Sequence, residues 1–403
     1  MAVALAGSLF LDISPTAARG KVLLFLAVSV APFAVVAPLI GPVIDRMAGG
    51  RRLVVQITAL GRAVVSILMM ANLDNVLLFP LAFAAMVLQK TYVVSKSALV
   101  PTVVSDEEEL VEANSKLGVI SGVVGFLAAI PAGLLHLISD RATLGFDALV
   151  FIGALMAAAQ LPREVVAAQR VGRVEQLELR SPGILLAATA MGLLRASVGF
   201  LFFHLAFWLR HADQNTGTLW FGLGVGLAAI GTMIGNSCGP FIRRAAREEV
   251  MLIGALGFTA LAGVGAALVG GVLAALLLMA AVNMAGAIGR LGFDSIVQRD
   301  ARGVNQGRAF AQFETKFQLA WVAAGIVPVL ITIPGSLGFA IVGALAAFAM
   351  VTYLASAQRV KKGLPLPQTL TGRAKQELNK RIEQRREGTP TRGSLRPPRP
   401  PDR

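Results

Sequence analysis

Long apolar runs alternate with short polar connections along almost the whole chain. A membrane-spanning helix needs about 20 consecutive, mostly apolar residues, and eleven runs have that length and composition. They lie at 22–42, 53–71, 76–94, 117–138, 142–161, 183–209, 219–242, 250–269, 272–291, 309–333 and 335–357. With 55% hydrophobic and only 15% charged residues, the composition also departs from that of a soluble domain. The pattern predicts an all-α integral membrane protein.

The opening run, Met1 to Leu11, is apolar but has only about half the length of a span. It is either a short re-entrant segment or a spanning helix whose first half precedes this sequence. A half-length segment in lipid leaves backbone groups unsatisfied, so we favour the second interpretation. It gives twelve transmembrane helices, the first of them truncated. A cleaved signal peptide is disfavoured because no basic flank precedes the run.

Basic residues indicate how the chain is threaded through the membrane. The connections expected on the inside carry seventeen Lys and Arg residues, and those on the outside carry four. Thirteen more follow Gln358. Because Lys and Arg collect in cytoplasmic loops, we expect both termini in the cytoplasm. The net charge of +14 is therefore a topology signal. Nucleic-acid binding would need a basic soluble face with stacking aromatic residues, a pattern that the sequence lacks. The 28 arginines against 9 lysines indicate a GC-rich bacterial genome, so we expect a bacterial cytoplasmic membrane.

One polar turn occurs twice. The pattern Gly-Pro-x-Ile-x-Arg stands at 41–46 and again at 239–244, 198 positions later. Pro131 and Pro328 repeat at an offset of 197. Similarity that keeps its register predicts two related six-helix halves. We expect bundles at 1–161 and 182–357, a cytoplasmic linker at 162–181, and a basic, partly disordered cytoplasmic tail at 358–403.

The first turn resembles the loop between helices two and three of the major facilitator superfamily, which reads roughly Gly-x-x-x-Asp-Arg-x-Gly-Arg-Arg. The matching residues are Gly41, Asp45, Arg46, Gly49, Arg51 and Arg52, with one extra residue before the second glycine. The second copy has Gly239, Arg243 and Arg244. There Arg243 replaces the aspartate, so we expect the salt-linked role of the acid to be lost in that half. The resemblance covers residues 1–357 and implies two pseudo-symmetric six-helix bundles that work by alternating access.

Asp45 is an isolated acid in a basic turn. The resemblance implies that it meets the start of the eleventh helix, near Arg308 and Ala309, and latches the two halves in one state. The arginines of the turn have another interpretation, as residues that fix the orientation of the chain in the membrane.

Glycines four residues apart let helices approach closely in lipid. The resemblance implies that the fifth and eighth spans meet between the halves and slide during transport; static packing is the alternative. The packing candidates are Gly118, Gly122, Pro131, Gly231 and Gly235.

Ionisable residues inside spans are costly and mark functional sites by default. Arg195 lies too deep to reach either surface, so it lines a central cavity or pairs with an acid, of which Asp147 is the nearest candidate. We expect Asn283 to make a hydrogen bond between helices, and His204 to be a histidine buried among aromatic residues. The cavity and substrate candidates are Arg195, Asp147, Asn283, His204 and Arg62.

Glu314 lies early in the eleventh span. With Arg290, Arg308 or Lys316 it forms either an inner gate or a surface ion pair, and the gate candidates are Glu314, Lys316 and Arg308. Lys90 is expected to extend to the inner surface.

The function that these features favour is secondary active transport, with proton-driven efflux of a small amphipathic compound. Small-metabolite uptake, or a transport-inactive scaffold acting through the tail, are the alternatives. Residues 235–239 fit Gly-x-Ser-x-Gly but continue a helical glycine ladder, so we expect no enzyme. Three histidines and one cysteine favour neither a metal nor another cofactor. The expected partners are a small substrate, protons and lipid, for a monomer.

The duplicated turn predicts that both copies lie on one face of the membrane. In a Cys238→Ser background, Ala48→Cys and Arg247→Cys should both react with a membrane-impermeant thiol reagent in inside-out vesicles, and neither in intact cells. Labelling from opposite faces would contradict the duplication.

Overall fold

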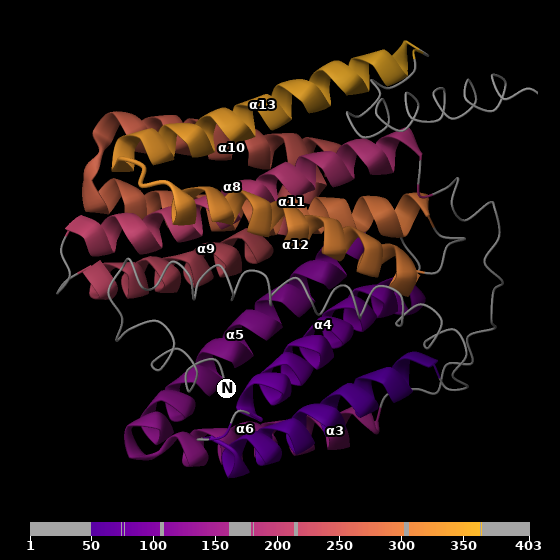
Figure 1. The fold of residues 1–403 in the computed structure, drawn as a ribbon. Helices are drawn as coiled ribbons and strands as arrows, with labels where there is room; N and C mark the ends of the chain where they lie inside the picture. Colours follow the sequence, from indigo (N-terminus) through magenta and orange to yellow (C-terminus); the bar gives the residue numbers. More distant parts are fainter. Residues whose placement is uncertain are drawn as a thin grey trace, which may run out of the picture. The chain divides into compact units, whose positions relative to one another are not determined.

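The computed structural model describes residues 50–73, 75, 77–104, 109–160, 179, 181–212, 217–301, 306–362 and 364. Within these ranges the chain forms ten α-helices and no strand (Figure 1). The helices are α3 (Gly50–Ala71), α4 (Leu78–Val103), α5 (Glu109–Ile138), α6 (Asp140–Ala158), α8 (Pro182–Ala212), α9 (Gly217–Ala245), α10 (Glu248–Val269), α11 (Gly271–Asp300), α12 (Gln306–Leu330) and α13 (Gly335–Lys361).

Ten of the predicted spans, from 53–71 to 335–357, each correspond to one helix, and the all-α prediction is confirmed over the described residues. At least eight of these helices are long and apolar enough to cross a membrane. Their outer faces expose large apolar side chains, such as Leu137 and Leu268, each 83% exposed. Such faces are stable only against lipid. The opening run and the span at 22–42 lie outside the described residues.

Three helices extend well beyond their predicted apolar runs. α4 continues to Val103, nine residues past the predicted end, and the other two are α5 and α11. α5 begins at Glu109, eight residues before the predicted start, and α11 continues to Asp300, nine residues past the predicted end. The extensions of α5 and α11 are amphipathic. In α11 the polar residues Asp294, Ser295 and Gln298 are buried against protein. A hydropathy average over the sequence assigns such a polar segment to a loop. The extensions therefore bring polar side chains into helix–helix contacts.

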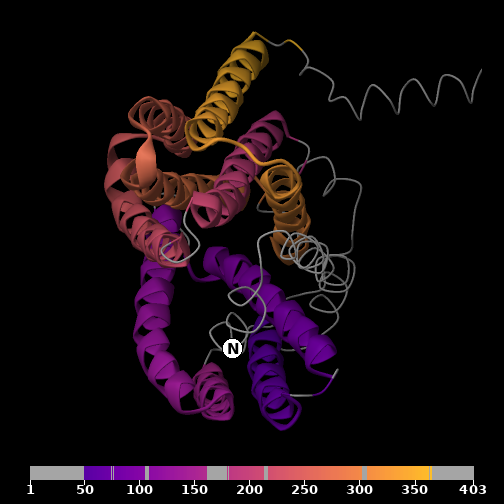
Figure 2. The same cartoon turned by 60° about the vertical axis from the view of Figure 1, so that its left-hand side comes forward.

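The core of the second predicted half forms where α8 and α11 meet neighbouring helices. α9 and α10 pack on α11, and α12 packs on α8 (Figure 1). One buried apolar cluster includes Leu201, Leu278 and Phe339, which are at most 1% exposed. In the first predicted half, α3 lies beside α6 and α4 (Figure 2).

The glycine ladder of α9 faces α11. A Cβ at Gly231 would collide with the Ala280 carbonyl oxygen, and one at Gly235 with the Met284 carbonyl oxygen. The assignment of these two glycines to the contact between the halves was therefore wrong. They bring α9 close to α11 within one half, because only a missing side chain allows backbones to touch.

The contact between the fifth and eighth spans does exist, as α5 against α9. A Cβ at Gly118 would lie 2.6 Å from Asn236 Nδ2, and one at Gly122 would lie 2.9 Å from Met233 Cγ. These two glycines, on α5, are the ones that allow the close approach. Pro131 lies further along the same helix, within its interior.

The second copy of the polar turn is helical. Residues 239–244 belong to the last turns of α9, which continues through Pro240 to Ala245. The prediction of a turn at this position was wrong, and the connection to α10 follows at Ala246 and Arg247. A proline lacks one donor but is tolerated inside a membrane helix when neighbouring groups compensate.

Contacts divide the chain into two units, Met1–Ala355 and Ser356–Arg403. The separation of the first unit into bundles at 1–161 and 182–357 stays a prediction. The predicted linker lies almost wholly outside the described residues, and so does most of the predicted tail.

Close packing of α9 on α11 predicts unequal effects of adding one methyl group. Gly235→Ala places Cβ 2.9 Å from Ala287 Cβ and should destabilise the protein by about 1–3 kcal/mol, the usual cost of overpacking. Gly226, where a Cβ meets nothing within 4 Å, provides the control. Thermal unfolding in detergent should show a lower midpoint for Gly235→Ala and an unchanged or higher one for Gly226→Ala. Equal midpoints would contradict the packing.

Candidate functional site

Buried charges gather where α4, α8, α11 and α12 meet. Glu314, only 5% exposed, accepts a hydrogen bond of 2.6 Å from Arg290 Nη1. Lys90 Nζ lies 3.9 Å from its other carboxylate oxygen. Arg290 Nε also pairs with Asp294 Oδ1 at 2.8 Å. We call the following six residues the central charge cluster: Lys90, Lys96, Arg195, Arg290, Asp294 and Glu314.

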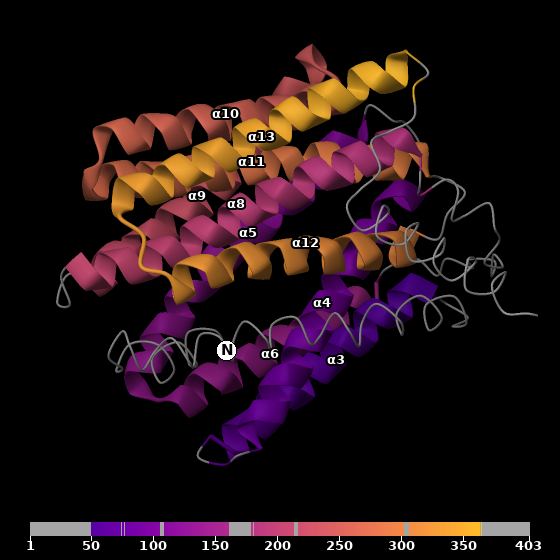
Figure 3. The ribbon, with the colours of Figure 1, turned by 45° about the horizontal axis from the view of Figure 1, so that its top comes forward.

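Glu314 and Arg290 lie well inside their helices. Glu314 lies eight residues after the start of α12, and Arg290 lies ten residues before the end of α11. At 1.5 Å per residue these positions are about 12–15 Å from the helix ends. α12 lies between α8 and α4 (Figure 3), so Glu314 can meet charges from both predicted halves.

Arg195 belongs to this cluster. Its charge interacts with those of Glu314 and Arg290, and its buried Nε has no hydrogen-bond partner among the described residues. Asp147, the predicted acid partner of Arg195, instead accepts a hydrogen bond of 2.7 Å from Ser66 Oγ. The pairing prediction was wrong because α12 supplies a carboxylate that sequence distance could not reveal.

Arg62 and Asp147 form a separate group in the first predicted half. Arg62 donates a hydrogen bond to Gln89 Oε1, and its guanidinium carbon lies 3.9 Å from the centroid of the Phe151 ring. Its charge interacts with that of Asp147. The group links α3, α4 and α6 with polar contacts, so it stabilises this half from within.

The remaining two cavity candidates make local contacts. Asn283 Nδ2 donates to the Met279 carbonyl of its own helix at 2.8 Å, not to another helix as predicted. His204 is 1% exposed, and its ring lies 5.7 Å from that of Phe200 and 5.8 Å from that of Phe339. This agrees with the favoured interpretation of a histidine buried among aromatic residues.

Of the proposed partners of Glu314, the structure selects Arg290. Lys316 is exposed, and its ammonium lies 5.2 Å from the Phe313 ring centroid. Arg308 is partly buried near the start of α12. Lys90 does not extend to the surface as predicted, because its ammonium reaches Glu314.

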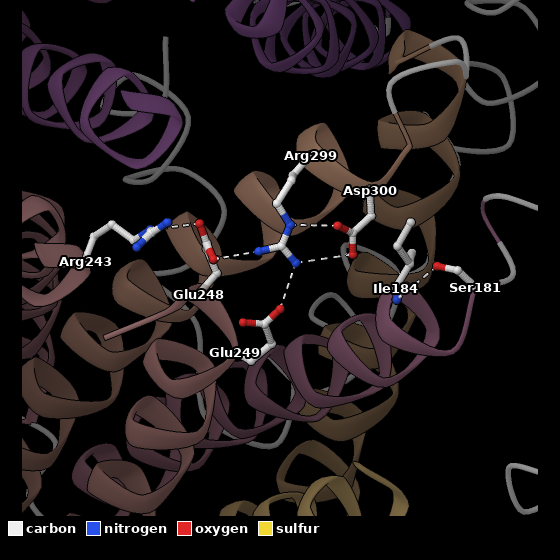
Figure 4. A network of polar contacts seen from close by, with 7 residues as sticks. All are labelled: Ser181, Ile184, Arg243, Glu248, Glu249, Arg299 and Asp300. Atoms are coloured by element: carbon white, nitrogen blue, oxygen red, sulfur yellow. Dashed lines mark hydrogen bonds and ion pairs between the residues drawn. The ribbon is translucent and has the colours of Figure 1, made fainter. Parts of the chain in front are cut away.

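A second charge network joins the ends of α9, α10 and α11 (Figure 4). Glu248 is 1% exposed and pairs at 2.8 Å with both Arg243 Nε and Arg299 Nη1. Arg299 further bonds Glu249 at 2.7 Å and Asp300 at 2.7 Å. Arg243, which stands where the first motif has Asp45, is itself paired with Glu248 of the next helix; the loss of the aspartate's own role in this half stays a prediction. Arg244 is exposed and lies over Phe241.

Polar contacts connect helices of the two predicted halves at the same ends. Asn114 Nδ2 donates to Gln298 Oε1 at 2.8 Å, and Gln298 Nε2 donates to the Ser97 carbonyl at 3.1 Å. Ser115 Oγ donates to the Asn236 carbonyl at 2.5 Å. These residues all lie toward the ends predicted to be cytoplasmic, so the halves are in contact on that side.

Most of the latch motif cannot be placed. Gly41, Asp45, Arg46 and Gly49 lie outside the described residues, as does the side chain of Arg51. Arg52 Nη2 donates to the Ala159 carbonyl at 2.6 Å. The latch between Asp45 and the start of α12 stays a prediction.

Sequence reasoning missed Asp294, Gln298, Glu248 and Glu249. Asp294 and Gln298 follow Arg290 at four-residue steps, which places all three on one face of a helix. That spacing was available in the sequence but lay beyond the apolar run. Among the described residues, no group of three or more His, Cys, Asp or Glu side chains could hold a metal ion.

The charge network predicts different effects for two adjacent acids. Glu248→Ala leaves Arg243 and Arg299 without their shared buried partner and should cost about 3 kcal/mol of stability, as for other broken buried pairs. Glu249 is 37% exposed at its side chain, so Glu249→Ala should cost about 1 kcal/mol or less. Unfolding midpoints in detergent test the difference. A Glu248→Ala protein as stable as wild type would show that the network has no structural role.

The chain is similar to known proteins both in sequence and in fold. The profile of the Major Facilitator Superfamily matches residues 2–325. The chain is 30% identical to an uncharacterized protein of Mycobacterium leprae over 86% of its length, and 30% identical to an uncharacterized protein of Mycobacterium tuberculosis over 60%. It spans 66% and 49% of the lengths of these two relatives.

Similar solved structures include the human organic anion transporter MFSD10, with a TM-score of 0.64, 18% identity, and coverage of 86% of this chain and 87% of that one. A bacterial homologue of the iron transporter ferroportin, in an outward-facing state, has a TM-score of 0.63 and 18% identity over 84% and 89% of the two chains. At this identity the likeness shows the fold. The resemblance first seen in the polar turn is thereby confirmed: the chain belongs to the major facilitator superfamily, as a multi-pass membrane protein with the fold of a transporter.

Proposed function

We propose that this protein is a secondary active transporter that expels a small amphipathic compound by alternating access, driven by a proton gradient. The observation that carries the proposal is the place of Glu314. It is a buried carboxylate about two turns inside α12, held by Arg290 from its own predicted half and by Lys90 from the other.

The contact between Lys90 and Glu314 couples charge to conformation. It crosses between the predicted halves, together with the polar contacts of Gln298 and Ser115. Protonation of Glu314 removes the negative charge that attracts Lys90. A ligand that weakens a contact made in only one state shifts the population toward the other state. Proton binding should therefore favour opening on the cytoplasmic side, and proton release should favour closure.

This coupling gives the direction of transport. A proton that enters from the outer side favours the state open to the cytoplasm, where the proton leaves and the substrate binds. Closure then carries the substrate to the outer side. The proton and the substrate cross the membrane in opposite half-cycles, which is the requirement for exchange. We place the protein in the bacterial cytoplasmic membrane as a monomer with both termini in the cytoplasm, because of its basic inner connections.

Two alternatives are separable from this proposal. Uptake of a small metabolite would use the same site, but the proton and the substrate would cross the membrane in the same half-cycle. A scaffold would act through the basic residues after Gln358 and would need no charge at Glu314.

Transport by the full chain in proteoliposomes tests the proposal. With a proton gradient imposed, the wild-type protein should move 8-anilino-1-naphthalenesulfonate or rhodamine 6G against its concentration gradient. Glu314→Gln should reduce this movement at least about tenfold, since a neutral amide cannot exchange a proton. Gln312→Ala, at an exposed position of α12, provides the control and should transport as wild type.

Gradient-driven transport that survives Glu314→Gln would contradict proton coupling at this residue. Loss of cellular function on deletion after Gln358, with normal function of Glu314→Gln, would favour the scaffold.

A further inference from the structure

We infer that the central charge cluster binds an amphipathic organic anion, with a carboxylate or sulfonate at Arg195 and an apolar body along α8 and α12. This inference rests on the proposed function, because it assigns a substrate class to the same site.

The cluster carries more positive than negative charge. Among the described residues it contains four cations and two carboxylates. Arg290 satisfies both carboxylates, at 2.6 Å to Glu314 and 2.8 Å to Asp294. The other cations of the cluster are Lys90, which also contacts Glu314, and Lys96 and Arg195.

Arg195 is where this excess is least compensated. It lies thirteen residues after the start of α8, about 20 Å along the helix, so its side chain has no route to the surface. Its Nε is buried and has no hydrogen-bond partner among the described residues. An arginine at the centre of a membrane is costly, and a bound anion offsets that cost.

The chemistry of Arg195 specifies the kind of anion. A guanidinium is planar and presents its donors as a fork that matches the oxygens of a carboxylate or sulfonate. Lys90 also interacts with Arg195, as a like charge that repels it across the two predicted halves. An anion between them replaces this repulsion with two attractions. The substrate itself would then stabilise the closed state on the cytoplasmic side.

The apolar part of the site follows from helix register. Phe202 lies seven residues after Arg195, and Trp321 lies seven residues after Glu314. Two turns apart, each pair shares one helix face, separated by about 10 Å along the axis. The rings of Phe202 and Trp321 lie 6.2 Å apart, and Phe221 lies 5.2 Å from Phe202.

These rings remain partly accessible. Phe202 and Trp321 are half-buried, in contrast to the fully buried Phe293 and Phe317 beside Arg290. The spacing between the charge cluster and these rings matches a molecule with one negative end and an aromatic body about 10 Å long. A cation would add to four like charges, and a neutral compound would leave Arg195 uncompensated.

Three naphthalene derivatives that differ in charge test the inference. They are 1-naphthalenesulfonate, 1-naphthylmethylammonium and 1-naphthalenemethanol, each added to the purified full-length protein in detergent. Only the sulfonate should raise the unfolding temperature and quench tryptophan fluorescence, because a ligand that binds the native state stabilises it.

Variants locate the binding to the cluster. Arg195→Gln should weaken sulfonate binding about tenfold or more, the effect of losing a charged hydrogen bond. Arg195→Lys should restore part of it, which a purely structural role would not predict. Trp321→Ala should weaken binding of the naphthalene compound but leave binding of methanesulfonate unchanged. Arg141→Gln, on the exposed surface of α6, should bind as wild type.

Binding of the ammonium or alcohol as tight as that of the sulfonate, or no binding of the sulfonate, would overturn the inference. Sulfonate binding that needs Arg195, without transport into vesicles, would support the inference and contradict the proposed function. Transport of rhodamine 6G together with absent sulfonate binding would do the reverse.

Discussion

The absence of water inside the bilayer is the constraint on which the rest of this structure depends. Backbone groups in lipid must be satisfied within the segment, so the described chain is built from long helices. The same constraint acts on side chains, since an isolated charge in the membrane is expensive. Arg290 lies deep in the bundle and engages two carboxylates at once. Exposed apolar side chains face outward, and the charges turn toward one another.

This constraint separates two kinds of polar group. The network of Arg243, Glu248 and Arg299 lies at helix ends, where four acid–base contacts pair nearly every charge. It fixes α9, α10 and α11 relative to one another. The central charge cluster lies deeper and carries an excess of cations. A network whose charges are nearly all paired suits a structural role, whereas an excess of cations inside the helix bundle suits a group that awaits a ligand or a proton.

Close backbone packing holds helices together within the second predicted half, and polar contacts hold the two predicted halves to each other. Within the second predicted half, glycines of α9 bring it against α11 at van der Waals distance, and such packing resists sliding. Between the halves, Asn114, Ser115 and Gln298 make hydrogen bonds at helix ends. Hydrogen bonds of this kind contribute about 1 kcal/mol each.

The sequence by itself determined the membrane class, ten of the helices and the family, because apolar length and a local motif are properties of neighbouring residues. It also identified Arg195 as a charge too deep to reach either surface, and Glu314 with Arg290 as one candidate inner gate. Only the tertiary structure decided the partners. The charge of Arg195 interacts with that of Glu314, Lys90 turns inward, Glu248 pairs with Arg243, and Gly231 and Gly235 face α11. Periodicity reports which face of a helix is polar but not which helix meets that face, and an ion pair depends on that meeting.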